Sequence, residues 1–197
     1  DGLSSSLSMI MLSVFAFVFA QLGVLSYTLL AISLIGTVLA FFYFNMFGSI
    51  ERGTKTFMGD TGSLVLGYAI AYLAIKYAMN NPAILPYRPH ALLLSFSLLL
   101  VPCFDLVRVA FGRLLRGVGI FQPDKTHLHH LCLAAGFGMR QSLLLIVGLQ
   151  ILLCLLNWYS YVYLALPTLF IVISNILFFA LLIFWLKWKA KLSSPSA

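Results

Sequence analysis

The 197 residues are 62% hydrophobic and 9% charged, with a formal net charge of +7. Their mean hydropathy of +1.04 excludes a water-soluble globular domain, because ordinary domains carry roughly 25% charged residues. Runs such as LSMIMLSVFAFVFA lack the alternation of membrane-barrel strands. The expected fold is therefore an all-α, polytopic transmembrane helical bundle, forming a single integral membrane domain over residues 1–197.

A helix needs about 20 mainly apolar residues to cross the hydrocarbon layer, and charges at its centre are costly. About six stretches of this chain meet both conditions. The first two are separated by only a few residues, which predicts a tight hairpin at the membrane surface. In chain order, the predicted spans are 7–24, 26–46, 62–79, 91–112, 141–158 and 163–186.

Nine of the twelve basic residues follow the second, fourth and sixth predicted spans, whereas the opposite side has Arg88 and, near a span end, Lys76. Even numbers of crossings separate these three segments, so all three would lie on one side of the membrane. By the positive-inside rule that side is the cytoplasm. The bases lie in short loops without interleaved aromatic residues, which disfavours a nucleic-acid-binding protein. They are Arg52 and Lys55, then Arg113, Arg116, Lys125 and Arg140, then Lys187, Lys189 and Lys191.

Asp60 lies where a turn flanked by Gly59 and Gly62 is expected to become a helix. As an alternative to function, it could cap that helix by accepting a hydrogen bond from a free amide. It could instead face a divalent cation, because Mg²⁺ prefers carboxylate oxygens and shares its shell with substrate phosphates. The open amides of the helix start would also favour an anion.

Lys55 and Asn45 precede Asp60, and each could have one of two roles. Lys55 could bind phosphate or serve, like Arg52, as a positive-inside anchor. Asn45, near the end of the second span, could be a buried polar link between helices.

The connection after the fourth span contains QPDKTHLHHL, in which Pro123 predicts a turn followed by a short helix. His127 and His130 are three residues apart and are expected to share a helical face, with His129 pointing elsewhere. Structural zinc needs four ligands, and no local cysteine pair supplies them. Imidazoles with Arg113, Arg116 and Lys125 suit an anionic ligand better, either substrate phosphoryl groups or anionic lipid headgroups.

Asp105 lies inside the fourth predicted span, three residues before Arg108. An ionisable residue in a span is a functional candidate, but an intrahelical ion pair is the preferred interpretation. A transporter would use Asp105 and the histidines as an ion path. Polar residues would then recur along several spans, whereas the first, fifth and sixth are nearly bare of ionisable groups.

Three segments, DGLSSSLS, KTFMGDTGSLVLGY and PDKTHLHHL, together resemble the polyprenyl-phosphate N-acetylhexosamine-1-phosphate transferases of glycosyl transferase family 4. The likeness runs from Asp1 to about Arg140. It implies transfer of a sugar 1-phosphate, of the N-acetylglucosamine type, from a UDP-N-acetylhexosamine to undecaprenyl phosphate. UMP would be released at the cytoplasmic face of a bacterial inner membrane, as the first step of a cell-surface polysaccharide such as O-antigen. Such an enzyme would contact membrane lipids, and a homodimer is also compatible with the resemblance.

The resemblance also implies roles for single residues. Asp60 matches the acid that holds Mg²⁺, with Mn²⁺ as an alternative metal. Asn45 and Phe57 match positions facing uridine, and Gly59 lies beside them in the substrate-binding segment. His127, His129 and His130 match the loop that contacts the phosphates. Asp1 matches an active-site carboxylate.

One part of the family pattern is absent, namely an earlier Asp-Asp motif with its upstream spans. We therefore expect this chain to be the C-terminal part of a longer transferase. A truncated or non-catalytic relative is the alternative.

Overall fold

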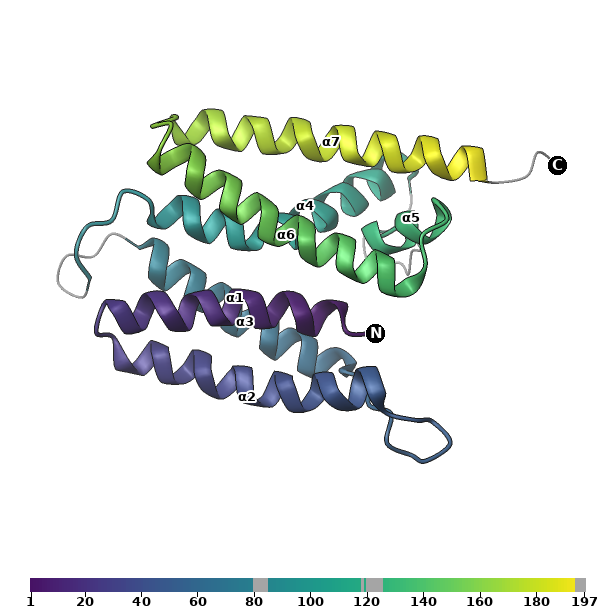
Figure 1. Ribbon diagram of the computed structural model, residues 1–197, viewed down its shortest axis with the longest axis horizontal. Coiled ribbons are helices and arrows are strands. Elements are labelled where there is room, and N and C mark those ends of the chain that lie inside the picture. Colours follow the sequence, from purple (N-terminus) through teal and green to yellow (C-terminus); the bar gives the residue numbers. More distant parts are fainter. Residues whose placement is uncertain (80–84, 118, 120–125, 194–197) are drawn as a thin grey trace. The chain divides into compact units, whose positions relative to one another are not determined.

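The computed structural model describes residues 1–79, 85–117, 119 and 126–193. These residues form helices and contain no strand, as Figure 1 shows. The helices are α1 Leu3–Gln21, α2 Leu25–Phe47, α3 Gly59–Ala78, α4 Ala91–Leu115, α5 Leu128–Ala134, α6 Met139–Val162 and α7 Thr168–Ser193.

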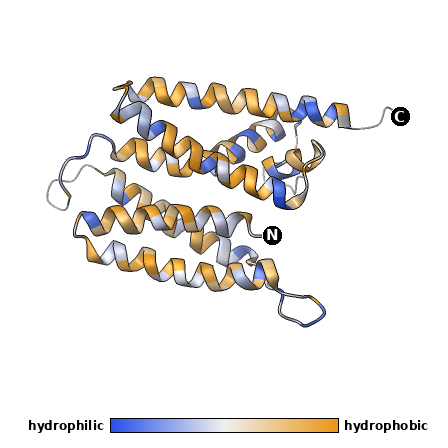
Figure 2. Ribbon diagram, viewed as in Figure 1, coloured by the Kyte–Doolittle hydropathy of each residue, from blue (hydrophilic) through white to orange (hydrophobic). Residues whose placement is uncertain are grey.

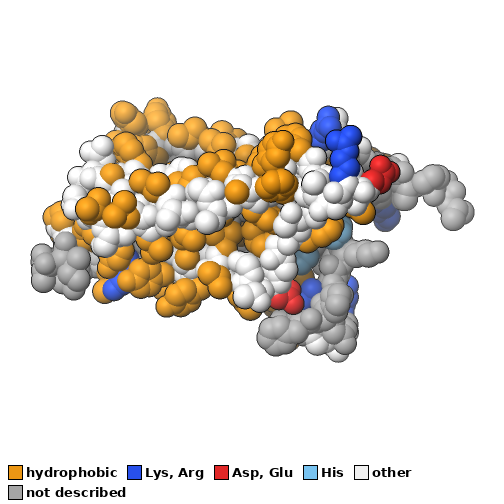
Figure 3. Space-filling view, turned by 90° about the horizontal axis from the view of Figure 1, so that it is seen from below, with side chains coloured by type: hydrophobic (Ala, Val, Ile, Leu, Met, Phe, Trp, Pro, Cys, Tyr) orange, Lys and Arg blue, Asp and Glu red, His pale blue; other side chains and the backbone are white. Residues whose placement is uncertain are grey.

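Six of these helices are long and apolar enough to cross a membrane, and α5, with seven residues, is not. Hydrophobic residues run along all six long helices in Figure 2. Apolar side chains also cover much of the surface drawn in Figure 3. Large side chains such as Leu25, Leu64 and Leu169 are more than 65% exposed, as expected for residues that face lipid rather than water. The prediction of an all-α, multi-pass membrane protein is confirmed.

The last predicted span begins too early. The segment 163–186 was expected to form it, but α6 continues to Val162 and α7 begins only at Thr168. Pro167 precedes α7, and the residue before a proline is disfavoured in helical geometry. Ala165 has a positive φ of 49°, which also interrupts the helical path. At its other end α7 extends beyond the apolar stretch through Lys187, Lys189 and Lys191.

The predicted hairpin between the first two spans is confirmed. Gly23, with a φ of 72°, adopts the left-handed conformation that glycine tolerates without strain. The Gly23 amide donates to the Ala20 carbonyl, and the Val24 amide donates to the Phe19 carbonyl. These two bonds satisfy two of the last carbonyls of α1 and let α2 begin at Leu25.

The described contacts divide the chain into two compact units, Asp1–Phe96 and Ser97–Ala197, with the division inside α4. In the first unit α1 packs against α2 and α3, and these helices lie side by side in Figure 1. Phe15 and Phe19 of α1 are fully buried. Both pack edge-on against Tyr77 of α3, with ring centroids 6.4 and 5.8 Å apart.

In the second unit a chain of buried amides links α4, α6 and α7. Gln150 of α6 is fully buried. Its Nε2 donates to the Ser97 carbonyl at 2.8 Å, and its Oε1 accepts from the Val101 amide at 3.3 Å. Asn157 continues the chain by donating to Ser97 Oγ and accepting from Asn175. In hydrocarbon each polar group needs such a partner, so these bonds hold α4, α6 and α7 in register. They lie just before Pro102 of α4, which cannot donate a backbone hydrogen bond.

Candidate active site

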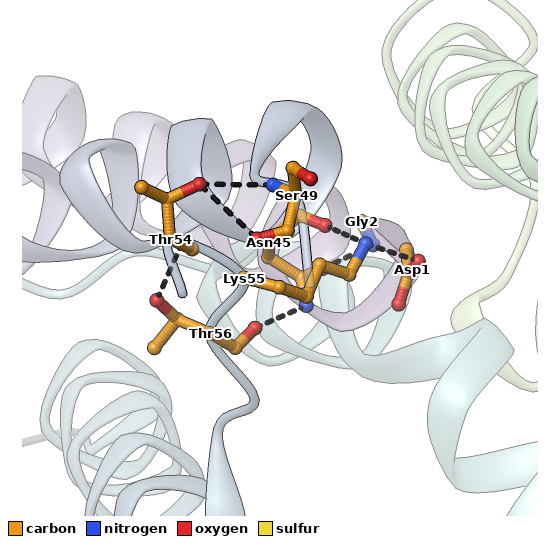
Figure 4. Close-up of polar contacts among 7 residues, drawn as sticks. All are labelled: Asp1, Gly2, Asn45, Ser49, Thr54, Lys55 and Thr56. Atoms are coloured by element: carbon orange, nitrogen blue, oxygen red, sulfur yellow. Dashed lines mark hydrogen bonds and ion pairs between the residues drawn. The ribbon is translucent and has the colours of Figure 1, made fainter. Parts of the chain in front are cut away.

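Two groups of polar side chains contain most of the predicted site residues. The amino-terminal cluster, drawn in Figure 4, comprises Asp1, Gly2, Asn45, Lys55 and Thr56. The histidine cluster comprises Asp105, Arg108, Thr126, His127, Leu128, His129 and His130. The first belongs to the first compact unit and the second to the other.

Asn45 is the centre of the amino-terminal cluster. It lies in the last turns of α2 and is 5% exposed. Its Oδ1 accepts from the Gly2 amide at 2.7 Å, and its Nδ2 donates to the Thr56 carbonyl at 2.8 Å. One side chain therefore joins the end of α2 to the start of α1 and to the following connection, which is the linking role that the sequence left open.

Lys55 reaches across the same cluster. Its Nζ donates to Asp1 Oδ2 at 2.6 Å and to the Asn45 carbonyl at 2.5 Å. The Lys55 side chain is 13% exposed, whereas that of Asp1 is 46% exposed. The ammonium is therefore largely covered, whereas the carboxylate that it holds is about half exposed.

Gly48 allows the connection after α2 to fold back closely. A Cβ there would lie 2.2 Å from the Phe44 carbonyl oxygen and 2.6 Å from the Thr54 carbonyl oxygen. Thr54 and Lys55 both donate backbone amides to the Ser49 carbonyl. These contacts close the connection over the end of α2 and bring Lys55 to Asp1.

Asp60 lies in the first turn of α3, as the sequence predicted. The N-cap is Met58, no side chain caps this helix, and Asp60 is exposed. The alternative in which Asp60 caps α3 is therefore wrong, because the residue is already inside the helix. Its charge faces the positive end of the helix dipole and is open to solvent.

Gly59 and Phe57 flank this acid. Gly59 begins α3 with a φ of 63°, a conformation that side-chain-bearing residues rarely adopt. Phe57 is 68% exposed. An exposed aromatic ring two residues before the first helical turn can stack on a planar base, which is compatible with the predicted uridine contact.

Asp105 organises the histidine cluster. Its Oδ1 accepts from Arg108 at 2.6 Å, so the predicted intrahelical pair is confirmed. Oδ1 also accepts from the Leu128 amide at 3.0 Å, and Oδ2 lies 3.0 Å from His127 Nδ1. Arg108 in turn donates to the Thr126 carbonyl. The sequence did not reveal that Asp105 contacts the histidine segment, because 22 residues separate it from His127.

The three histidine side chains are not arranged as predicted. His127 is the N-cap of α5, with an extended ψ of 157°, so helical spacing does not apply to its side chain. The His129 ring lies close to both of the others, with its centroid 6.1 Å from that of His127 and 4.0 Å from that of His130. The expectation that His129 points away was wrong, and the three imidazoles form one group.

The pKa of His129 is lowered, mainly by burial and further by the neighbouring His130 and His127. Because the ordinary value is near 6.5, His129 is neutral at pH 7. A neutral imidazole offers one donor and one acceptor.

Two of the predicted phosphate-binding bases lie near the end of α4. Arg113 belongs to its last turn. Arg116 follows the helix, and its Nε donates to the Gly112 carbonyl at 3.0 Å. Lys125, predicted with them, lies outside the described residues.

The donor set of the first unit suits magnesium better than zinc. Mg²⁺ is usually held by one or two carboxylates with substrate phosphates and water. The exposed Asp60 carboxylate fits that pattern. Among the described residues no three His, Cys, Asp or Glu side chains gather as a metal cage.

Comparison with known proteins shows which family the chain resembles. Residues 1–78 match the family model described as glycosyl transferase family 4. The chain is 29% identical, over 80% of its length, to the undecaprenyl-phosphate alpha-N-acetylglucosaminyl 1-phosphate transferase of Yersinia pestis, of which it covers 41%. It is 34% identical, over 74% of its length, to the probable undecaprenyl-phosphate N-acetylglucosaminyl 1-phosphate transferase of Bacillus subtilis (strain 168), of which it covers 38%. The predicted resemblance to glycosyl transferase family 4 is confirmed.

The chain spans about two fifths of the length of these curated relatives. No solved structure matches it.

Proposed function

We propose that the chain takes part in the transfer of N-acetylglucosamine 1-phosphate, or that of a related hexosamine, from a UDP-sugar to undecaprenyl phosphate. The names of the Yersinia pestis and Bacillus subtilis relatives describe this type of transfer. The observation that carries the proposal is Asp60, an exposed carboxylate in the first turn of a long apolar helix. Such a position serves a reaction between a soluble nucleotide and a membrane lipid.

In this reaction a lipid phosphate oxygen attacks the β-phosphorus of the UDP-sugar. The bond from that phosphorus to the bridging oxygen breaks, and its electron pair leaves with UMP. The product is a lipid-linked sugar diphosphate. Catalysis of phosphoryl transfer consists mainly of alignment and charge neutralisation.

The residues divide these tasks. Asp60, with Asp1 as a second acid, would hold Mg²⁺, which neutralises phosphate charge when bound. Phe57 would stack on the uracil. The histidines, with Arg113, Arg116 and Lys125, would bind phosphoryl oxygens. The bound Lys55 would act by holding Asp1 in place.

A cytoplasmic orientation supports a shared substrate. Two crossings, α3 and α4, separate the connection that contains Lys55 from the one that contains His127. Both would therefore face the same side, and their basic residues favour the cytoplasm, where UDP-sugars are available. We propose the inner membrane of a bacterium as that membrane.

The test is transfer from radiolabelled UDP-N-acetylglucosamine to undecaprenyl phosphate in membranes containing the protein expressed from its complete reading frame. Asp60→Asn should lower lipid-linked product at least about 100-fold, the scale seen when one group that stabilises transition-state charge is removed. EDTA should abolish the product and Mg²⁺ should restore it.

The matched control is Glu51→Gln, which makes the same charge change at an exposed acid of the preceding connection. This variant should transfer at the parent rate. A parent protein without product would refute the proposed function and favour a non-catalytic relative, and an active Asp60→Asn variant would refute the role of Asp60.

A further inference from the structure

We infer that Asp105 is a positioning residue: it holds His127 as the Nδ1–H form and so makes Nε2 the ring nitrogen that meets a phosphoryl oxygen. This inference rests on the proposed function for the identity of that phosphoryl group. The orientation of the ring is a separate matter that can be measured without turnover.

The hydrogen-bonding capacity of the carboxylate assigns the proton. An ionised carboxylate only accepts hydrogen bonds. Oδ1 already accepts from Arg108 and from the Leu128 amide, and Oδ2 lies 3.0 Å from His127 Nδ1. Nδ1 must therefore carry a hydrogen in both the neutral and the charged ring. Nε2 is then the atom at which a proton is gained or lost.

The backbone on both sides of His127 is attached to the same helix. Arg108 donates to the Thr126 carbonyl, and Asp105 accepts from the Leu128 amide. Leu128 is 2% exposed, so this first-turn amide of α5 could not be satisfied by water. Three consecutive residues are thus held to α4 by three separate hydrogen bonds, which limits rotation of the ring as well as movement of the segment.

Charge balance favours an anionic ligand at Nε2. Arg108 offsets Asp105, so protonation of His127 adds a net positive charge to the cluster. A carboxylate on the far nitrogen stabilises an imidazolium that forms during reaction, as in the Ser-His-Asp triad. Nε2 carries a hydrogen only in the charged ring, so it is the imidazolium, protonated from solvent, that donates Nε2–H to the incoming phosphoryl oxygen.

A purely structural role for Asp105 would consist of pairing with Arg108 and accepting from Leu128. Asp105→Asn separates the two roles. The Asn oxygen can still accept from the Leu128 amide, but its NH₂ group would face Nδ1 and donate to it. The neutral ring would have to exchange to the Nε2–H form while the segment keeps its shape.

The test is ¹⁵N NMR of histidine-labelled protein, expressed from the complete reading frame and held in lipid nanodiscs. The His127 signals are assigned by their loss in His127→Gln. We expect a protonated Nδ1 in the parent and an unprotonated Nδ1 in Asp105→Asn. Asp60→Asn, which removes a carboxylate from the first turn of α3, should leave these signals unchanged.

An unprotonated Nδ1 in the parent protein would overturn the inference, and this measurement does not depend on folding of the Asp105→Asn variant. An Asp105→Asn spectrum with Nδ1 still protonated would also overturn it.

The transfer assay provides the second readout. Asp105→Asn should lower kcat about 10- to 100-fold, as loss of a partner behind a functional group does, with KM for the UDP-sugar close to the parent value. An unchanged kcat would reduce Asp105 to a structural residue. A parent protein that transfers nothing would refute the proposed function and leave the NMR result to decide the orientation of His127.

Discussion

Single side chains in this protein hold several backbone segments together. Asn45 satisfies one amide and one carbonyl from two segments, and Asp105 satisfies an amide, a guanidinium and an imidazole. A buried group without a partner costs free energy, so each such residue determines where its partners lie. The polar residues of the candidate site are therefore structural and functional at once.

Asn45→Leu tests whether the hydrogen bonds of Asn45 stabilise the fold. Leucine has a similar volume but leaves the Gly2 amide and the Thr56 carbonyl without their partner. A buried unsatisfied group costs about 1–3 kcal/mol, so we expect a clear fall in the unfolding temperature, followed by intrinsic fluorescence in detergent micelles.

Ser33→Ala is the matched control, because it removes an exposed hydroxyl bond within the same helix. Its unfolding temperature should stay near that of the parent. An equal change in the two variants would show that the Asn45 bonds contribute little.

The path of the connection after α2 is determined by close contact between backbone atoms. Gly48 lies against carbonyl oxygens of Phe44 and Thr54 and against the Lys55 backbone. Backbone atoms cannot rotate away as a side chain could. Glycine is therefore required here because a Cβ would collide with the backbone of the connection. A left-handed backbone is not the reason, since the φ of Gly48 is −66°.

Gly48→Ala should displace the connection and separate Lys55 from Asp1. We expect a loss of about 1–3 kcal/mol in the free energy of unfolding, as for overpacked positions, and faster tryptic cleavage after Arg52. Thermal unfolding and limited proteolysis measure the two effects.

Gly36→Ala changes the same residue type in the same helix where a Cβ meets nothing within 4 Å. Alanine is a better helix former by about 1 kcal/mol, so this variant should be as stable as the parent or more so. Cleavage of Gly48→Ala at the parent rate would contradict the packing argument.

The described residues contain six helices that are long and apolar enough to cross a bilayer. Each connection alternates sides, and the basic residues indicate which side is cytoplasmic. The proposed function requires the connections that follow α2 and α4 to share that side.

Cysteine labelling tests the topology. In a background without Cys103, Cys132 and Cys154, single cysteines at Glu51 and Met139 should react with an impermeant maleimide only after the cells are permeabilised. Single cysteines at Tyr87 and Tyr163 should react in intact cells. Glu51→Cys and Met139→Cys on opposite sides would refute a shared substrate.

Much of this protein follows from local sequence. Long apolar runs predict the helices, because in hydrocarbon a helix satisfies its backbone hydrogen bonds within itself. The short separation of the first two spans predicts the hairpin, and the motif around Asp60 predicts the start of α3. The family resemblance was also readable, since its motifs consist of adjacent residues.

The tertiary structure alone decided the partners of the site residues. Lys55 meets Asp1 across 54 positions, Gly2 meets Asn45 across 43, and His127 meets Asp105 across 22. Helical periodicity carries no information over such separations, and it misled where His127 proved to be a non-helical cap. Backbone hydrogen bonds within a helix are set by neighbours in the chain, whereas the partner of a polar side chain is set by which helices pack against each other.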